Sequence, residues 1–425
     1  MQIKMDIQKY IEGLSKGKKD NLSVENVKFF MNKLGNPQAK LKFIHVTGTN
    51  GKGSVVEMLN NILIKNNYKV GKFISPHLIK YNERISVNNI NIKDEELEKI
   101  YEELEPIIET YQKEMTFFDF TTITALLYFY KKKVDIVVME VGLGGLYDST
   151  NVINPIISII NLIGIDHTNI LGKTLKEIAI QKAGIIKENS NTVYVSQEKV
   201  IDDIIVQKCK EKNNKLYLID TSKTTNLRYE KDYEIFNYKQ YKNIEINLKG
   251  KKQIQNAIIS LECCEILEEN GFEFTEKKIR EGLKTVVHKG RFEVIHKNPT
   301  IIFDGGHNAQ AIENLKDTID IYYKNAKKIY VMSILKSKDY KTILEELIED
   351  GNIYIFTNGN DKNRYADSHL MYEYSKKLNA NIEMYEMDLK EAIQFCKEKV
   401  DYVSFIIGSF YVYNDVKKIL CNCSD

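Results

Sequence analysis

A glycine-rich run at residues 46–54, VTGTNGKGS, places the strongest limit on what this chain can fold into. The apolar residues 42–46 before it are typical of a short buried strand, and apolar residues recur with helical spacing from residue 55 to 63. The glycines therefore fall where a strand turns into a helix. Backbone N–H groups there can approach phosphate oxygens, and the helix N-terminus adds about half a positive charge. The run predicts a nucleotide triphosphate site.

Two side chains of this run suit such a site. Lys52 is placed to reach the β- and γ-phosphates, and Ser54 to bind Mg²⁺. The hydroxyl comes one residue later than in the standard phosphate-loop pattern, so the match is imperfect. The alternative is a glycine-rich strand-to-helix turn that carries a surface lysine.

Size and charge limit the classes of partner. At 425 residues the chain has room for at least two domains, each with its own core. Its 61 Lys and Arg residues nearly balance its 59 Asp and Glu residues. Because no global field favours nucleic acid or an anionic membrane, we expect neither as a partner.

Cysteine usage and hydropathy indicate the compartment. The six cysteines form neither a CxxC pair nor a disulfide framework, which fits a reducing environment. The first residues lack the apolar stretch of a secretory leader, and no run of about 18 apolar residues occurs. We expect a cytoplasmic protein.

Hydrophobic patterning predicts two α/β domains. In the first, residues 42–75 form a βαβ unit, and continuous apolar runs at 134–141 and 155–162 are typical of central parallel strands. Residues 226–249 alternate like antiparallel strands. The prediction is a phosphate-loop-type parallel sheet in residues 1–288 and a smaller Rossmann-like domain in residues 289–425, with a hinge near 287–290. Further expected helices are 94–113, 121–130, 175–183, 253–269, 309–323, 339–349, 367–378 and 389–398, and further strands are 192–196, 300–304, 328–333, 352–357, 382–386 and 402–407.

Candidate metal ligands follow separate predicted strands. Ser75, Glu140 and His167 each come at or after the carboxyl end of one strand, where open parallel sheets bind ligands. Glu140 is placed to hold Mg²⁺, and convergence of the three side chains would allow a second ion. The alternatives are a loop-facing Glu140 and a structural His167, because imidazole is an unusual ligand for Mg²⁺.

Other candidates need more support from context. Lys182 would ordinarily be a solvated helix lysine, and beside Mg²⁺ it would have to be neutral or modified. Arg291, at the predicted hinge, could clamp a transferring phosphate. Asp304 and His307 follow an apolar strand and could contact ribose or the acceptor, although DGGH is also a plausible turn and helix cap.

The ordered set of motifs resembles one known family. From residue 45 to about 416 the chain is similar to the folylpolyglutamate synthase and dihydrofolate synthase family of Mur-type ligases. Each segment alone is weak, but their coincidence in the same order is specific. The segments that carry the resemblance are 47–54, 75–78 with 83–85, 140–145, 148–151, 166–167 with 171–172, 182–185, 290–293, 304–308 and 408–409.

The resemblance implies ATP-dependent amide formation. A folate or dihydropteroate carboxylate would attack the γ-phosphate, and the amino group of L-glutamate would displace phosphate from the acyl phosphate. Lys52, Lys182 and His307 would be catalytic, with Lys182 carbamylated and therefore anionic. The implied nucleotide contacts are Thr49, Asn50, Gly51, Lys52, Gly53, Ser54, Asn256, Arg291 and Asp304; the metal ligands, for two Mg²⁺ ions, are Ser54, Ser75, Glu140 and His167; and the substrate contacts are Arg84, Phe118, Asp119 and Thr121 on the pterin or folate side and His307 and Ser409 near glutamate.

The chain departs from the family pattern at several positions. Leu146 stands where the family usually has Arg, Gln181 replaces an acidic residue, and Lys252 replaces His. Phe118-Asp119 stands for the commoner Phe-Glu, and residues 288–289 replace Trp-Pro. No phosphate or metal ligand is lost, so the departures concern substrate positioning.

Two rival functions remain beside this expectation. A ligase acting on a UDP-linked substrate would need an additional N-terminal domain of about 100 residues, and only 44 residues precede His45. A nucleotide-binding pseudoenzyme would keep the fold without turnover. Within the family, the residues do not separate addition of the first glutamate to dihydropteroate from extension of folate, and relatives favour a monomer.

Overall fold

The computed structural model describes residues 6–15, 24–359, 361, 363–379 and 381–422. The chain divides into two compact units, which are described separately. The first comprises Met1–Leu227, Phe236–Ile246 and Gln255–Val286, and the second comprises Arg228–Ile235, Asn247–Ile254 and Val287–Asp425, apart from residues outside the described ranges.

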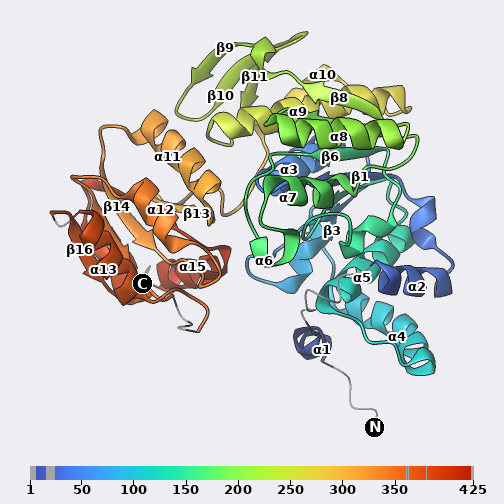
Figure 1. The fold of residues 1–425 in the computed structure, drawn as a ribbon, viewed down its shortest axis with the longest axis horizontal. Helices are drawn as coiled ribbons and strands as arrows, with labels where there is room; N and C mark the ends of the chain where they lie inside the picture. Colours follow the sequence, from blue (N-terminus) through green and yellow to red (C-terminus); the bar gives the residue numbers. More distant parts are fainter. Residues whose placement is uncertain (1–5, 16–23, 360, 362, 380, 423–425) are drawn as a thin grey trace. The chain divides into compact units, whose positions relative to one another are not determined.

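An eight-stranded sheet forms the centre of the first unit, with strand order β4-β3-β2-β5-β1-β6-β7-β8 (Figure 1). The strands from β2 to β8 in that order pair in parallel, whereas β3 and β4 form an antiparallel edge. The predicted parallel α/β architecture is therefore confirmed. The strands are β1 (Phe43–Thr47), β2 (Val70–Phe73), β3 (Ile85–Val87), β4 (Ile90–Asn91), β5 (Ile136–Glu140), β6 (Ile157–Ile160), β7 (Asn191–Val195) and β8 (Lys215–Ile219).

The central strands are apolar because both faces of the sheet are covered. Every residue of β1, β2, β5 and β6 is buried, as expected for parallel strands between helical layers. Gly282 of α10 shows how closely two of these helices pack, since a Cβ there would lie 2.7 Å from the Cα of Ile62 in α3. The helices are α1 (Ile7–Gly13), α2 (Glu25–Lys33), α3 (Lys52–Lys65), α4 (Asp94–Tyr111), α5 (Phe117–Lys132), α6 (Thr168–Leu171), α7 (Leu175–Ala183), α8 (Lys199–Glu211), α9 (Lys251–Glu269) and α10 (Glu276–Lys284).

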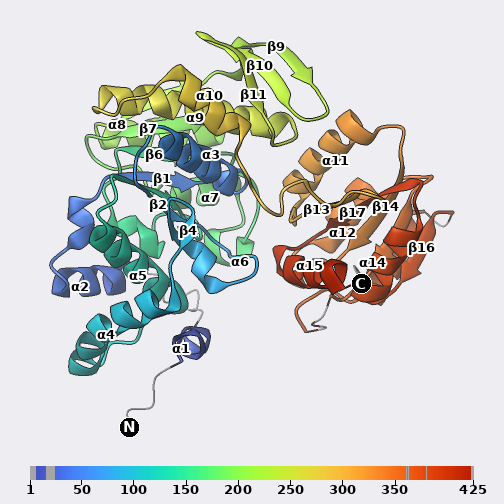
Figure 2. The same ribbon diagram turned by 180° about the vertical axis from the view of Figure 1, so that it is seen from behind.

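A six-stranded sheet forms the second unit, with order β12-β13-β17-β14-β15-β16 (Figure 2). All its pairs are parallel except β12 with β13. Its core includes Tyr330, Tyr354, Phe356 and Phe405. The elements are β12 (Glu293–His296), β13 (Ile301–Asp304), β14 (Lys327–Met332), β15 (Ile353–Phe356), β16 (Glu383–Glu386), β17 (Tyr402–Ile407), α11 (Ala309–Tyr323), α12 (Tyr340–Leu347), α13 (Ser368–Leu378), α14 (Leu389–Glu398) and α15 (Tyr413–Asn422).

A separate three-stranded sheet contains β9 (Thr224–Tyr229), β10 (Glu234–Tyr238) and β11 (Tyr241–Ile246). Two segments beside these strands belong to the second unit, although the sequence prediction placed them in the first domain. Contacts with α11 explain the difference. The Tyr322 hydroxyl donates to Glu234 Oε1 at 3.0 Å, and a Cβ on Gly250 would meet Thr318 Oγ1 at 2.3 Å.

Candidate functional site

The glycine-rich run folds as the predicted turn between β1 and α3. Gly51 caps α3 with a left-handed φ of 83°, and its carbonyl accepts from Val55 N. The residues after β6 support the turn, because Thr49 N donates to Leu162 O at 2.7 Å and the Thr49 hydroxyl bonds Gly164. The sequence therefore produces a loop whose backbone N–H groups surround a helix N-terminus, the arrangement that suits phosphate.

Lys52 and Ser54 lie in the first turn of α3. Lys52 Nζ donates to Gly48 O at 2.9 Å and Thr49 O at 3.4 Å, so its ammonium bonds its own loop. Ser54 is buried, with 3% of its surface exposed. The structure thus places both residues where the glycine-rich loop passes into α3.

The predicted metal ligands collect at one edge of the first sheet. In the order β2-β5-β1-β6, the carboxyl ends of adjacent parallel strands lead to Ser75, Glu140, the phosphate loop and His167. Glu140 ends β5, is 4% exposed, and its Oε2 accepts from Ser75 N at 3.1 Å. His167 is the N-cap residue of α6, with φ 50°, and its backbone N donates to Asp166 Oδ1 at 2.8 Å.

The donor set is a test of fit for Mg²⁺. Ser54, Ser75 and Glu140 supply hydroxyl and carboxylate oxygens, which Mg²⁺ prefers, whereas the His167 imidazole is less typical. Among the described residues no group of three His, Cys, Asp or Glu side chains could hold a metal by itself. An ion here would therefore depend on hydroxyls, water and phosphate oxygens, as Mg²⁺ sites with substrate phosphates do.

Lys182 lies buried on α7, with 3% of its surface exposed. Burial holds the pKa of its ammonium well below the ordinary value, and nearby Lys52 lowers it further, while Asp166 and Asp148 oppose the shift. No hydrogen bond or ion pair joins its Nζ to any residue that the structure describes. At any given pH such an amine is neutral, and therefore nucleophilic, in a larger fraction of molecules than an exposed lysine.

The loop after Glu140 packs on the helix that carries Lys182. Leu146 N donates to Gln181 O at 2.7 Å, and a Cβ on Gly145 would lie 2.8 Å from the same oxygen. A Cβ on Gly184 would meet the Leu146 Cα at 2.4 Å. Leu146 and Gln181 are two of the positions at which the chain departs from the family pattern. The hydrogen bond between them joins backbone atoms and therefore does not depend on the identity of either side chain.

Arg84 and the start of α5 form the predicted substrate side. Arg84 is buried, its Nε donates to His77 Nδ1 at 2.8 Å, and its guanidinium lies 5.1 Å from the Phe117 ring centre. Burial and the adjacent Arg84 charge lower the pKa of His77 to about 4. Phe118 lies against Gly142, where a Cβ would come within 2.3 Å of its ring.

Asp119 and Thr121 bond within the protein. Asp119 completes a capping box with Thr116, and its carboxylate also accepts from Asn26 Nδ2 at 3.1 Å and Ser149 Oγ at 2.7 Å. The Thr121 hydroxyl is fully buried and donates to Phe117 O at 2.6 Å. These bonds hold the start of α5 in place. They do not test the predicted contact of Asp119 and Thr121 with substrate, which stays a prediction.

The predicted residues of the second unit share the carboxyl edge of β13 and β17. Arg291 Nη1 lies 3.9 Å from Asp304 Oδ1, and its guanidinium lies 4.5 Å from the Phe410 ring centre. Asp304 accepts from Phe292 N at 2.9 Å and Gly306 N at 2.7 Å. Burial raises the pKa of Asp304, although Arg291 and these bonds oppose the shift.

His307 and Ser409 lie beside this pair. His307 Nδ1 is 2.9 Å from Gly305 O, and because a carbonyl only accepts, Nδ1 carries the proton and Nε2 is the acceptor of the neutral ring. Ser409 is 1% exposed and its Oγ accepts from Tyr411 N at 3.1 Å. The structure therefore gathers the predicted residues into two groups, one in each unit.

Arg364 is a candidate that the sequence analysis missed. Its guanidinium lies 4.5 Å from the ring centre of Tyr411, and the hydroxyl of its neighbour Tyr365 bonds Ser409. The sequence around Arg364 is polar and carries no motif. Its position after the carboxyl end of β15 could have indicated it as a candidate, because open parallel sheets bind ligands at those strand ends.

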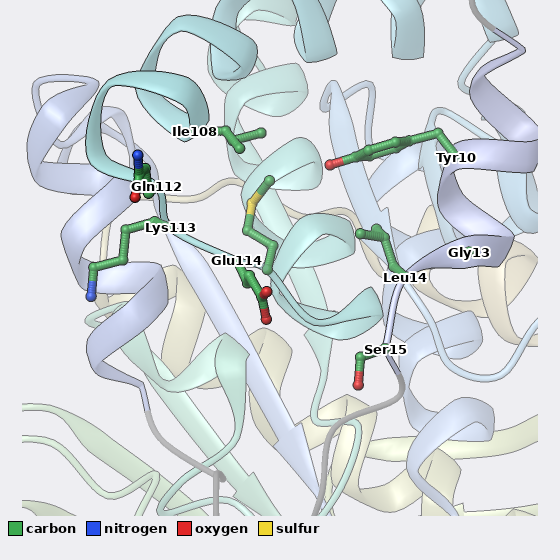
Figure 3. Close-up of a pocket in the computed structure, with 9 residues that line it drawn as sticks. Tyr10, Gly13, Leu14, Ser15, Ile108, Gln112, Lys113 and Glu114 are labelled. Atoms are coloured by element: carbon green, nitrogen blue, oxygen red, sulfur yellow. The ribbon is translucent and has the colours of Figure 1, made fainter.

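A cavity of about 560 Å³ adjoins α1 and the end of α4 (Figure 3). None of the predicted site residues lines it, and we assign it no role. Its lining residues are Tyr10, Gly13, Leu14, Ser15, Ile108, Gln112, Lys113, Glu114 and Met115. In the described part of the chain, every helix is too short or too polar to cross a membrane.

Comparison with known proteins defines the class first. The Mur ligase middle domain matches residues 46–264, and the Mur ligase glutamate ligase domain matches residues 290–409. With the phosphate loop and the two sheets described above, these matches make the chain a Mur-type ligase.

Full-length relatives then define the family. The chain is 35% identical to the dihydrofolate synthase/folylpolyglutamate synthase of Bacillus subtilis, and the alignment covers 98% of each. It matches a crystal structure of folylpolyglutamate synthase from Thermotoga maritima at 32% identity and a TM-score of 0.83, covering 99% of this chain and 97% of that one. Escherichia coli FolC in complex with DHPP and ADP matches at 26% identity and a TM-score of 0.85, covering 98% and 97%. The chain belongs to the dihydrofolate synthase/folylpolyglutamate synthase family.

Proposed function

We propose that this chain uses ATP to join L-glutamate to the carboxylate of dihydropteroate or of a folate. The observation that carries the proposal is the phosphate loop beside the Ser75–Glu140 contact, at adjacent strand ends of one sheet. The family relationship adds support, since FolC of Escherichia coli has been seen with DHPP and ADP. The geometry suits a reaction that transfers a phosphoryl group.

The chemistry balances in two steps. A carboxylate oxygen of the pteroate attacks the γ-phosphorus and ADP leaves, which gives an acyl phosphate. The glutamate amine then attacks the acyl carbon, inorganic phosphate leaves, and the amine loses a proton. His307 would accept that proton, because its Nδ1–H donates to Gly305 O and Nε2 is therefore the basic atom of the ring.

Lys52 and the loop would bind the phosphates, with Thr49, Asn50, Gly51, Gly53 and Asn256 as further nucleotide contacts. Ser54, Ser75, Glu140 and His167 would hold two Mg²⁺ ions, which neutralise charge on the phosphates when bound. Glu140 is preorganised for this role by its bond from Ser75 N. Arg291 and Asp304 would contact ATP from the second unit, which we assign to residues 289–425.

Lys182 would carry a carbamate. Its neutral amine would add to CO₂, forming an N–C bond and releasing one proton, and the product is an anion. The buried side chain near Lys52 supports the assignment, because a carbamate removes the repulsion between two ammonium groups.

On the acceptor side, Arg84, Phe118, Asp119 and Thr121 would bind or frame the pterin or folate. His307 and Ser409 would bind glutamate. We further propose that one copy of the chain suffices and that it works in the cytoplasm, where ATP is available and where the free cysteines of the described chain would stay reduced.

The test is an assay of purified protein with ATP, Mg²⁺ and L-glutamate, supplied with dihydropteroate in one arm and tetrahydrofolate in the other. The proposal expects ADP and a glutamylated product in equal amounts in at least one arm. A rate of ADP formation that is the same with and without the acceptor and glutamate would instead favour a nucleotide-binding protein without ligase activity. The ratio of the rates with dihydropteroate and with tetrahydrofolate shows whether addition of the first glutamate or extension of folate is the faster reaction.

A further inference from the structure

Arg364 follows the carboxyl end of β15, and its backbone is tied to the segment after the neighbouring strand, β14. Lys336 N donates to Arg364 O at 3.1 Å. The next residue, Tyr365, forms an antiparallel bridge with Leu335. Two adjacent strand ends of the second sheet therefore fix the point from which the Arg364 side chain extends.

Ser409 connects the two tyrosines that flank Arg364. It follows β17 and is the N-cap residue of the short 3₁₀ helix η6 (Phe410–Val412). Its Oγ accepts from Tyr411 N at 3.1 Å and bonds the Tyr365 hydroxyl. The Arg364 guanidinium lies 4.5 Å from the Tyr411 ring centre. The side chain is thus held by Tyr365 along the chain and by Tyr411 in space.

The charge of Arg364 has no acidic partner. No residue in the described ranges gives its guanidinium a hydrogen bond or an ion pair. Arginine is scarce in this chain, at five of the 61 basic residues, and three of the others lie within 4 Å of a carboxylate. Because the contact with Tyr411 holds the guanidinium in place, its fork of N–H donors is available to an acceptor. The three paired arginines are Arg228 with Glu230, Arg280 with Glu276 and Arg291 with Asp304.

A fixed guanidinium without an acidic partner suits a carboxylate, which it binds with two parallel hydrogen bonds. We propose that Arg364 binds the side-chain carboxylate of the incoming L-glutamate and so distinguishes glutamate from glutamine. The inference rests on the proposed function, in which His307 accepts the proton of the glutamate amine. The His307 ring lies 6.3 Å from the ring of Phe410, the residue before Tyr411. The amine and the side-chain carboxylate would therefore lie at neighbouring rings of one short helix.

Steady-state kinetics of Arg364→Met and Arg364→Lys test the contact. Loss of a hydrogen bond to a charged group corresponds to roughly a ten- to hundredfold change in affinity. We expect Arg364→Met to raise the KM for L-glutamate by about that factor, with kcat and the KM for ATP changed less than about twofold. Arg364→Lys should lie between Arg364→Met and wild type, because lysine keeps the charge and loses the fork.

Two substrate analogues show which carboxylate Arg364 binds. L-glutamine carries an amide in place of the side-chain carboxylate, and L-isoglutamine carries one in place of the α-carboxylate. In Arg364→Met the preference for glutamate over glutamine, as a ratio of kcat/KM values, should fall by about ten- to hundredfold. The preference for glutamate over isoglutamine should stay within about twofold of wild type, because both compounds keep the carboxylate that Arg364 binds.

Lys327→Met is the matched control. Lys327 Nζ lies 5.6 Å from the ring centre of Tyr402, so the control also removes a cation from a tyrosine ring of the same sheet. Lys327 and Tyr402 begin β14 and β17, at the amino ends of these parallel strands, which is the edge opposite Arg364. This variant should keep the KM for glutamate and both preferences of the wild type.

The outcomes separate the alternatives. A KM for glutamate within about twofold of wild type in Arg364→Met would overturn the proposal, as would an equal rise in Lys327→Met. A preference over isoglutamine that falls while the preference over glutamine stays would assign Arg364 to the α-carboxylate and overturn its role in excluding glutamine. Wild-type protein that forms no glutamylated product would instead refute the proposed function itself.

Discussion

At the scale of single residues, two charged side chains dominate the proposed reaction. Phosphoryl transfer depends on positioning and charge neutralisation rather than on covalent chemistry of the protein. Lys52 stands on the phosphate loop, and Glu140 stands one strand away with its carboxylate fixed by Ser75 N. Substitution of Lys52 removes a positive charge from this edge of the sheet, and substitution of Glu140 removes a negative one.

We predict that Lys52→Ala and Glu140→Ala each lower turnover by at least about a thousandfold, because each removes a charge on which phosphate or Mg²⁺ binding depends. Circular dichroism should show an intact fold. Lys65→Ala is the control, since this lysine lies on the same helix and pairs with Glu281 on the surface. Near-normal rates for either test variant would exclude the site.

Lys182 gives a prediction about CO₂. Burial holds the pKa of its amine well below the ordinary value and so favours the neutral form, which is the form that adds to CO₂. Activity should fall when protein and buffers are freed of CO₂, return with bicarbonate, and be absent without recovery in Lys182→Met. The control is Lys187→Met, because burial also lowers the pKa of Lys187, to about 8, but its Nζ bonds Asn151 O. Activity indifferent to CO₂ would contradict the carbamate.

Much of the site could be predicted at this scale, because the residues stand in motifs. Ser75, Glu140 and the phosphate loop lie at adjacent strand ends, as expected. The positions of Asn161 beside Gly51 and of Arg364 beside Tyr411 could not be predicted, since each contact joins residues that are distant in sequence. Asp119 and Thr121 stand in a segment chosen from the family resemblance, but only the fold shows that Asp119 accepts from Ser149 and that Thr121 donates to Phe117 O.

At the scale of elements, the turn from β1 to α3 depends on Gly51. Its φ of 83° disfavours any side chain, and a Cβ would also clash with Asn161. Gly271 has nearly the same φ, 84°, with no atom within 4 Å of the Cβ position. The two glycines therefore separate backbone strain from steric clash.

We predict that Gly271→Ala costs about 1–2 kcal/mol of stability and leaves activity unchanged, because only the left-handed strain acts there. Gly51→Ala should also weaken ADP binding by at least about tenfold, since Asn161 or the loop must move. Chemical unfolding and calorimetric ADP binding measure the two effects. If Gly51→Ala and Gly271→Ala bind ADP equally well, the close approach of Asn161 to Gly51 is not needed for nucleotide binding.

Glu234 makes the packing of α11 pH-dependent. It is fully buried at the start of β10, its Oε1 accepts from Gly250 N and Tyr322, and its Oε2 has no partner. Burial raises the pKa of Glu234 to about 7, although these bonds and Lys249 oppose the shift. The folded state thus binds more protons than the unfolded state between pH 4.5 and about 7, and stability falls as pH rises through that interval.

We predict that Glu234→Gln removes this loss. The interval corresponds to about 3 kcal/mol, so the stability of the variant relative to wild type should increase by a few kcal/mol between pH 4 and pH 8. Urea unfolding at both pH values gives the difference. Glu313→Gln, on the outer part of α11, is the control and should show no comparable change. A flat difference for Glu234→Gln would show that this carboxylate is ionised at ordinary pH in the folded chain.

Element prediction succeeded where periodicity was strong. The ranges of α7, α11, α14 and β17 agree with the expected ones to the residue. The sequence analysis did not predict α8, β8 or α10, whose short amphipathic patterns are interrupted by charged residues. Helix α5 begins four residues earlier than expected, at Phe117, because Thr116 and Asp119 form a capping box.

At the scale of the whole molecule, the glycine-rich loop lies in the first unit, and Arg291, Asp304 and His307 lie in the second. The sequence predicted two α/β domains, but it did not show that the segments around Glu234 and Gly250 pack with the second unit. Those contacts involve α11, more than sixty residues further along the chain, and are therefore invisible to local patterns.

The central claim is that cleavage of ATP to ADP and phosphate in this protein is coupled, through an acyl phosphate, to formation of an amide between a pteroate and glutamate. The most direct measurement is the ¹⁸O content of the released phosphate in two experiments. The first uses ATP labelled with ¹⁸O only at the three terminal oxygens of its γ-phosphate. The second uses unlabelled ATP and a pteroate whose carboxylate carries ¹⁸O. In the second experiment one carboxylate oxygen should appear in the released phosphate, because the acyl phosphate passes it on when the glutamate amine attacks. Phosphate that takes its fourth oxygen from water in both experiments would contradict the account.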